Sequence, residues 1–487
     1  MRQVFYLALL SLVIGDVNLG AQSTEPGTAG ILRVVLDPSR TGPEIPEDFV
    51  GLSYEKTILA QPGVFTPGNA VLQRLLVQLG KGNLRMGAGA VESTGWTRQP
   101  RSSSTGDRVV TADDLDSFYA FVKATGWNVV HAVNLRSSNP GIAADEAQYA
   151  AMKAGSSLVA FEIGNEPDLK PGDTRYAVED YIREFRAFAS AIRERVPGAR
   201  FVGPGATCFP SRDLQFLTRG VDEWAVPFAG ELGKEIVQLT QHIHVVGQPY
   251  QTEPEESFVA SIPTLLSSVS RNRYTGVLEK LVKAAEKAGI PYRINETNSC
   301  YHGGKEGVSN TFASALWGAD YLFTLASYGA SGVNLHAGTQ FYTPIETRET
   351  NQSLARPLYY GLLLFRMCAH GRLIPANVVS GPKLEVSTYA TLARDGSVAV
   401  AIINREQAKD VTVQLDASRY FKEGRLLRLE APSLSATSGV TLGGAPVSPD
   451  GSWKPASNQT LSREDRFFLI HVPASSAAVV NLQKAHH

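Results

Sequence analysis

Apolar and polar residues follow one pattern from Phe49 to His370 and another after it. In the first region, short apolar runs recur and are separated by segments whose apolar residues lie three or four positions apart. Short runs of this kind are typical of buried strands, and the wider spacing is typical of amphipathic helices. The pattern predicts eight strands, namely Val50–Tyr54, Leu84–Gly89, Asn128–Leu135, Ser157–Ile163, Phe201–Thr207, Ile243–Gly247, Tyr292–Asn295 and Gly332–His336.

The segments between these strands complete an alternating order. Helical spacing is clearest at Val71–Leu79, Leu115–Val122, Tyr181–Arg195 and Leu278–Lys287. Strand and helix alternating over residues 49–370 predict an α/β fold, a (β/α)8 TIM barrel with enlarged loops. A doubly wound nucleotide-binding sheet is disfavoured, because Gly87-Ala88-Gly89 follows the second strand and lacks a third glycine.

Residues 371–487 have a different pattern, in which short apolar segments are separated by Gly, Pro, Ser and Asn. Val398–Ile403, Val411–Leu415, Leu426–Leu429 and Arg466–Val472 are of this kind. Such spacing predicts a C-terminal β-sandwich domain. Ile31–Leu36 lies before the barrel, in a lead-in at residues 22–48, and has the same character, so we expect it to add a strand to the C-terminal sheet.

The first residues predict export. Met1-Arg2 gives a positive start, Val4–Ile14 is apolar, and Leu19-Gly20-Ala21 resembles a small-residue cleavage site. Residues 1–21 are therefore interpreted as a signal peptide, which predicts a secreted or periplasmic protein. The apolar run is too short to span a membrane, and we expect no membrane span.

Composition narrows the range of partners. The chain has 487 residues, 43% of them apolar and 19% charged, with a formal net charge of -1. Nothing in this balance favours a polyanion-binding surface, so we expect no nucleic-acid partner. Cys208, Cys300 and Cys368 are too few and too far apart to predict a disulfide framework or a zinc site.

Two carboxylates carry the candidate chemistry. Glu166 follows the apolar strand that ends at Ile163, within Gly164-Asn165-Glu166-Pro167, and Glu296 follows the apolar run Tyr292–Asn295. The carboxyl ends of barrel strands are where such folds place their active sites. Two carboxylates held at rigid strand ends are the arrangement that glycoside hydrolysis requires. Either Glu alone is better explained as a capping or ion-paired surface residue, and it is the pair that favours the catalytic interpretation.

These positions resemble those of the clan of retaining (β/α)8 glycosidases, whose acid/base follows an Asn at strand four and whose nucleophile ends strand seven. Within the clan, Asn295-Glu296-Thr297-Asn298-Ser299-Cys300-Tyr301, the early Gly51-Leu52-Ser53-Tyr54-Glu55 and the β-rich C-terminal region resemble glycoside hydrolase family 79. That family contains β-glucuronidases and heparanase-like enzymes. The resemblance implies double displacement on a β-linked glucuronic acid, with Glu296 as nucleophile, Glu166 as acid/base, and no metal or other cofactor.

The resemblance also implies substrate contacts. Asn165 is expected to bind the sugar 2-hydroxyl, and Glu55 to accept bonds from sugar hydroxyls. After Glu296 come Tyr301, Gly303, Gly304 and Lys305, whose hydroxyl, backbone N–H groups and ammonium could bind a glucuronate carboxylate. Tyr250 and Tyr342, after strands six and eight, could converge on the same place.

The expected partner is thus a β-glucuronide or a glucuronate-containing glycan. The alternatives are an endo-acting heparanase-like hydrolase, a neutral-sugar β-glycosidase of the same clan, and a noncatalytic carbohydrate-binding protein. Asp168 is assigned to a loop outside the chemistry. For His242 and His244, a core role and a site role are equally compatible with the sequence.

Overall fold

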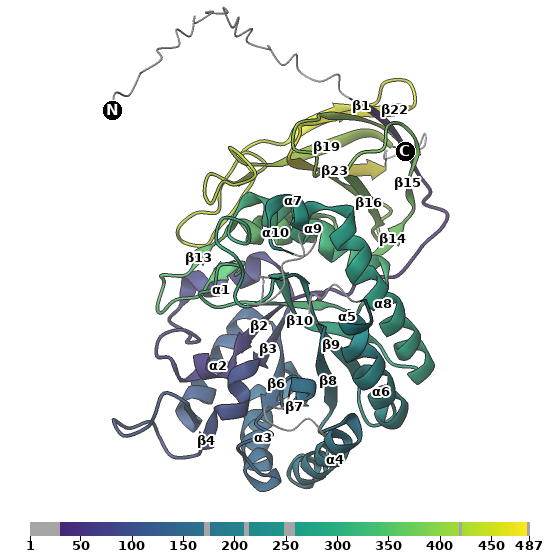
Figure 1. Ribbon diagram of the computed structural model, residues 1–487. Helices are drawn as coiled ribbons and strands as arrows, with labels where there is room; N and C mark the ends of the chain where they lie inside the picture. Colours follow the sequence, from purple (N-terminus) through teal and green to yellow (C-terminus); the bar gives the residue numbers. More distant parts are fainter. Residues whose placement is uncertain (1–29, 170–175, 209–213, 248–258, 418–420, 485–487) are drawn as a thin grey trace, which may run out of the picture.

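The computed structural model describes residues 30–169, 176–208, 214–247, 259–417 and 421–484 (Figure 1). The predicted signal peptide, residues 1–21, and the candidate residue Tyr250 lie outside the described residues. Among the residues described, no helix is long and apolar enough to cross a membrane.

Eight parallel strands close into a barrel, which confirms the predicted fold class. In barrel order they are β10, β11, β2, β3, β6, β7, β8 and β9. Their bounds are β2 Val50–Glu55, β3 Asn83–Gly87, β6 Asn128–Val133, β7 Leu158–Ile163, β8 Phe201–Cys208, β9 Gln238–Val246, β10 Tyr292–Cys300 and β11 Val333–His336. All are buried along most of their length, as parallel strands covered by helices must be.

Helices surround the barrel (Figure 1). They are α1 Ala70–Gln78, α2 Ala112–Thr125, α3 Pro140–Ala154, α4 Val178–Arg195, α5 Leu214–Arg219, α6 Val226–Leu232, α7 Ile262–Leu266, α8 Ser268–Ala288, α9 Phe312–Ser327 and α10 Pro357–Cys368. Their ends follow local sequence rules. In α2, Thr111 and Asp114 form a reciprocal capping box, and Gly126 ends the helix in the left-handed conformation.

The seventh barrel strand is longer than its apolar run indicated. The prediction ended it at Asn295, whereas β10 continues to Cys300, so Glu296 lies inside the strand. The register with β9 shifts between Ile294 and Glu296. This irregularity lets Asn295 and Glu296, although consecutive, both contact the same polar network inside the barrel.

The C-terminal part consists of two sheets. One has four strands in the order β15 (Ala376–Ser380), β1 (Gly30–Leu36), β18 (Val411–Asp416) and β22 (Phe467–Val472). The other contains β14 Arg372–Ile374, β16 Val386–Leu392, β17 Val398–Asn404, β23 Ser476–Lys484, β19 Phe421–Glu430 and β20 Thr441–Leu442, with β21 Gln459–Ser462 beside β19. Alternate residues of both sheets meet in one apolar core, as in a β-sandwich.

The chain's first strand therefore belongs to its last domain. β1 runs antiparallel to β15 and parallel to β18, and it lies between them. Leu32, Val34 and Leu36 are buried in the sandwich core. The barrel begins only after the chain has crossed from this sheet.

The larger sheet is buried on both faces. Its second face, including Ile403, Leu429 and Val479, belongs to the same apolar cluster as α9 and α10 of the barrel. Asp320 of α9 pairs with Arg271 of α8 and also with Arg405, which directly follows β17. The sandwich also caps α9, because Ala436 and Leu434 accept the N–H groups of residues 312 and 313. The helix that follows the Glu296 loop is thus held by both domains.

Candidate active site

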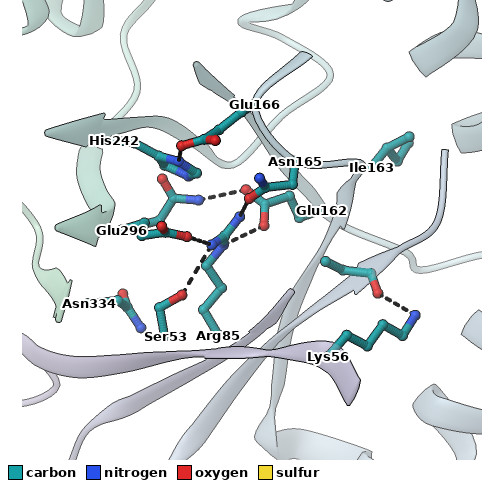
Figure 2. A network of polar contacts seen from close by, with 12 residues as sticks. Ser53, Lys56, Arg85, Glu162, Ile163, Asn165, Glu166, His242, Glu296 and Asn334 are labelled. Carbon is teal, nitrogen blue, oxygen red and sulfur yellow. Dashed lines mark hydrogen bonds and ion pairs between the residues drawn. The ribbon is translucent and has the colours of Figure 1, made fainter. Parts of the chain in front are cut away.

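Glu166 and Glu296 come together at the carboxyl ends of the barrel strands (Figure 2). One carboxylate oxygen of each lies within 4.8 Å of the other. Retaining glycosidases hold their two carboxyl groups roughly 5–5.5 Å apart, whereas inverting enzymes keep roughly 6.5–9.5 Å. The pair therefore has the separation that a retaining mechanism requires.

A strained turn presents Glu166. Gly164 (φ 76°) and Glu166 (φ 44°) both adopt left-handed backbone conformations, and Pro167 starts a short 3-10 helix. A Cβ on Gly164 would meet a carboxylate oxygen of Glu92 at 2.8 Å, and that oxygen accepts the N–H of Asn165. A non-glycine residue at positive φ is uncommon and costs energy, which often marks a functional position.

Glu296 is held by a buried cation. Arg85 Nη1 donates to Glu296 Oε2 at 2.7 Å, and the arginine side chain is fully buried. Burial alone would raise the pKa of Glu296. The imidazoles of His336 and His242 and the guanidinium of Arg85 outweigh burial and hold this pKa well below its usual range. Glu296 is thus kept ionised, as a nucleophile must be.

Arg85 also connects the two halves of the site. Its Nε donates to Glu162 at 2.6 Å, and its Nη2 donates to Asn165 Oδ1 at 2.8 Å. The sequence analysis identified neither Arg85 nor Glu162 as a site residue. The available signal was a charged residue inside each of the apolar runs 84–86 and 161–163.

The orientation of Asn165 follows from its partner. A guanidinium can only donate, so the side-chain atom of Asn165 that faces Arg85 is the oxygen. The amide nitrogen is consequently left to donate elsewhere. Asn165 is buried and directly precedes Glu166, so this donor is available at the centre of the site.

Three histidines line the same face of the barrel. His242 Nδ1 lies 2.9 Å from Glu166 Oε1. His336 lies 3.8 Å from Glu296 and 3.7 Å from Glu55. Burial lowers the pKa of His244 to about 4, so this ring is neutral at physiological pH. His242 therefore contacts a candidate catalytic carboxylate, a role that the sequence left undecided.

Two further carboxylates border the pair. Glu55 accepts the N–H of Ala90 at 2.6 Å, and burial raises its pKa. Asp168 accepts the N–H of Thr207, and burial, followed by the charge of Glu166, raises its pKa to about 7. Asp168 is thus electrostatically coupled to Glu166, although the sequence analysis had placed it outside the chemistry.

The loop after β10 packs against the loop after β11. Gly303 and Gly304 adopt left-handed conformations, and a Cβ on Gly304 would lie 2.8 Å from the backbone nitrogen of Tyr342. Tyr342 is buried edge-on to His336, and the charges of Glu296 and Glu55 contribute to its raised pKa, after burial. The ring of Tyr301 lies edge-on to His244. Tyr301 and Tyr342 are thus both at the catalytic face.

Lys305 has a backbone partner. Its Nζ donates to the carbonyl of Ala260 at 2.8 Å. Its backbone N–H donates to Ser309 Oγ at 3.0 Å. The side chain therefore braces the loop with one of its three N–H donors.

Within the described residues, the groups that could ligate a metal ion are Glu166, His242 and Glu296. Arg85 already occupies one oxygen of Glu296 with a positive charge. A cation placed there would be repelled by the guanidinium. The cluster fits proton transfer between carboxylates and imidazole better than it fits a metal ion.

The chain is similar to known proteins in sequence and in fold. The C-terminal β domain of glycosyl hydrolase family 79 matches residues 388–479. A β-glucuronidase of Aspergillus niger is 25% identical over 421 residues, covering 75% of each chain, and a heparanase of Bos taurus is 25% identical over 56% of this chain and 49% of its own. A 4-O-α-L-rhamnosyl-β-D-glucuronidase from Fusarium oxysporum shares the fold, with a TM-score of 0.71 and 17% identity over 93% of this chain and 100% of its own.

The barrel, its carboxylate pair and the attached β domain define a glycoside hydrolase. The resemblance to glycoside hydrolase family 79 found in the sequence is confirmed, and residues 388–479 match the C-terminal β domain of that family.

Proposed function

We propose that the protein is a retaining β-glucuronidase in which Glu296 is the nucleophile and Glu166 the acid/base. The observation that carries this proposal is the approach of the two carboxylates to within 4.8 Å at the barrel mouth. The β-glucuronidase and heparanase relatives support a glucuronate-containing substrate.

In the first step, the Glu296 carboxylate attacks the anomeric carbon while the bond to the leaving oxygen breaks. The proton of Glu166 passes to that oxygen, and a glycosyl ester of Glu296 remains. In the second step, water attacks the anomeric carbon and gives its proton to Glu166. The ester bond breaks, and Glu296 is released as a carboxylate.

The neighbours of the pair support these roles. Arg85 keeps Glu296 ionised before attack, and Asn165 can donate to the sugar 2-hydroxyl as positive charge develops on the ring. Glu55 is close enough to His336 and the pair to accept from another hydroxyl. For the substrate carboxylate, the candidates are the backbone donors of Gly303 and Gly304 together with Tyr301 and Tyr342.

The central experiment measures turnover of a panel of aryl glycosides. We expect activity on the aryl β-glucuronide, none with Glu296→Gln, and slow glycosylation with Glu166→Ala when the leaving group needs no proton. Azide should restore turnover of Glu166→Ala and give a β-configured glycosyl azide. An inverted first product would show that Glu296 is not the nucleophile.

Substrate charge is tested by Tyr301→Phe. We expect kcat/KM to fall much more on an aryl β-glucuronide than on the matching β-glucoside, because a hydrogen bond to a charged group contributes about 1.5–3 kcal/mol. Lys305→Ala should have a smaller effect, since its Nζ binds the Ala260 carbonyl. Equal losses on both sugars would place carboxylate recognition elsewhere.

We also propose that the protein is exported, on the basis of the pattern at residues 1–21. N-terminal sequencing of protein recovered from a secreting host is expected to begin close to residue 22. A mature chain that still began at Met1 would refute this.

A further inference from the structure

Glu162 is a buried carboxylate that the proposed reaction does not use. Its side chain has no exposed surface, and it lies on β7, four residues before Glu166. Oε2 accepts from Arg85 at 2.6 Å, and Oε1 accepts from Asn295 Nδ2 at 2.5 Å (Figure 2). Glu162 and Glu296 both bind the Arg85 guanidinium, so this group of two carboxylates and one guanidinium carries a net negative charge.

His242 links this cluster to Glu166. Its Nδ1 lies 2.9 Å from Glu166, whereas its Nε2 is buried and has no hydrogen-bond partner among the described residues. Nε2 and Glu162 Oε1 face the same small space beside Gly205. A Cβ on Gly205 would lie 2.9 Å from Glu162 Oε1 and 3.2 Å from His242 Nε2.

Electrostatics decides which ring nitrogen of His242 carries hydrogen. A lone pair on Nε2 would face the same space as the Glu162 carboxylate, which is negative. An N–H on Nε2 would be attracted by this carboxylate, and burial weakens the screening of that attraction. With hydrogen on Nε2, a neutral imidazole can only accept at Nδ1.

We propose that Glu162 is a positioning residue for the catalytic proton: its carboxylate keeps hydrogen on His242 Nε2, so that Nδ1 accepts a hydrogen bond from the Glu166 carboxylic acid. If Nδ1 carried the only ring hydrogen instead, Glu166 would have to be ionised and could not protonate a leaving group. The charge of Glu162 thus favours the form of the Glu166–His242 pair that holds two protons. This inference rests on the proposed acid/base role of Glu166.

Other titratable groups face this pair from the surrounding elements. They are Arg85 on β3, Asp168 in the 3-10 helix after β7, His244 on β9, Glu296 on β10, His336 on β11 and Tyr342 after β11. A test must therefore isolate the path from Glu162 through His242.

The first measurement is the pH profile of kcat/KM for an aryl β-glucuronide whose leaving group needs protonation. The basic limb of this profile reports the acid in the free enzyme. Glu162→Gln is expected to move that limb to lower pH by about one unit or more, because His242 Nε2 then loses the charge that holds its hydrogen, and Nδ1 no longer favours protonated Glu166.

A double-mutant cycle tests the path. In a His242→Ala background, Glu162→Gln should no longer move the basic limb, because the imidazole that transmits the effect is gone. A full shift in that background would overturn the role of His242. Asp320→Asn is the matched control. Asp320, like Glu162, is a buried carboxylate paired with arginine, but it lies at the sandwich interface. It should leave the profile unchanged.

A dinitrophenyl β-glucuronide separates this effect from disturbance of Arg85 and Glu296. Its leaving group needs no proton, so the loss with Glu162→Gln on this substrate measures only the nucleophile side. Equal fold losses on both substrates with an unmoved basic limb would overturn the inference and leave Glu162 a purely structural residue. Failure of the proposed function is distinct, because the wild-type enzyme would then not turn over either glucuronide.

Discussion

At the scale of single residues, one guanidinium holds the nucleophile in place. Arg85 contacts Glu296, Glu162 and Asn165 from inside the barrel, where none of its surface is exposed. A buried ion pair that loses one partner leaves an uncompensated charge, which is strongly unfavourable. Arg85 is therefore expected to matter both for folding and for the acid side of the pH profile.

Arg85→Lys should move the acidic limb of kcat/KM to higher pH and lower activity at pH 3 by about tenfold. A lysine ammonium lacks the planar fork that reaches Glu296, Glu162 and Asn165 together, so the pKa of Glu296 rises toward its usual value. In the wild type, the pKa of Glu296 is lower in the folded than in the unfolded state. The ionised carboxylate therefore stabilises the fold above the unfolded-state pKa, and this stabilisation is lost as the pH falls through the folded-state pKa. Arg405→Lys, a buried arginine of the interface, is the control. An unmoved acidic limb would contradict this account.

The pKa of Asp168 is shifted in the opposite direction to that of Glu296. Its pKa is raised to about 7, first by burial and then by Glu166. Stability from its neutral form is fully present below the unfolded pKa and is lost as pH rises through about 7. Asp168→Asn should therefore raise the melting temperature at pH 8 by a few degrees relative to wild type and change it little at pH 3, below the unfolded pKa. Equal effects at both pH values would mean that Asp168 is not neutral in the fold.

The sequence predicted the site only in part, for a physical reason. Glu166 and Glu296 were found because each follows an apolar strand, a signal that is local in the chain. Arg85 and Glu162 act through partners on other strands, so their roles depend on barrel closure. An ion inside an apolar run marks such residues, but it does not indicate which partner neutralises them.

At the scale of elements, periodicity located all eight barrel strands but not all their ends. β10 extends past its apolar run because Asn298 and Ser299, although polar, are fully buried and hydrogen-bonded near the catalytic face. β9 begins five residues before its predicted start, with Gln238, Thr240 and His242 among its polar members. A catalytic barrel needs polar residues at interior positions of its strands. These residues interrupt the apolar runs, so the ends of such strands cannot be located from the runs alone.

The neighbouring residues Ile31 and Leu32 test the placement of β1. Leu32 is 3% exposed in the sandwich core, whereas Ile31 is 53% exposed on the outer face. Leu32→Ala should lower the free energy of unfolding by about 2–5 kcal/mol. Ile31→Ala should change it by less than about 0.5 kcal/mol. Chemical denaturation of both variants measures the difference, and similar values would be inconsistent with β1 as an inner strand.

At the scale of the whole molecule, the barrel and the sandwich share one apolar cluster through α9, α10 and the larger sheet. The sandwich also supplies the carbonyl groups that cap α9. Domains joined by a large apolar interface are expected to unfold together rather than independently.

A chain that ends at Arg372 should therefore be insoluble or inactive. Without the sandwich, the apolar face of α9 and α10 would be exposed and β1 would have no partner strands. Solubility, circular dichroism and aryl glucuronide turnover of the shortened chain provide the measurement. A soluble and active product would show that the barrel is independent.

The position of β1 has a consequence for the timing of synthesis. Residues 30–36 leave the ribosome before the rest of the described chain, but their partner β18 (Val411–Asp416) is made only after the entire barrel. At roughly 5–20 residues per second, translation takes about 20–80 s to reach that partner. Throughout this interval the apolar side of β1 is exposed to solvent or bound by a chaperone. The strand that is translated first among the described residues is thus among the last to find its place.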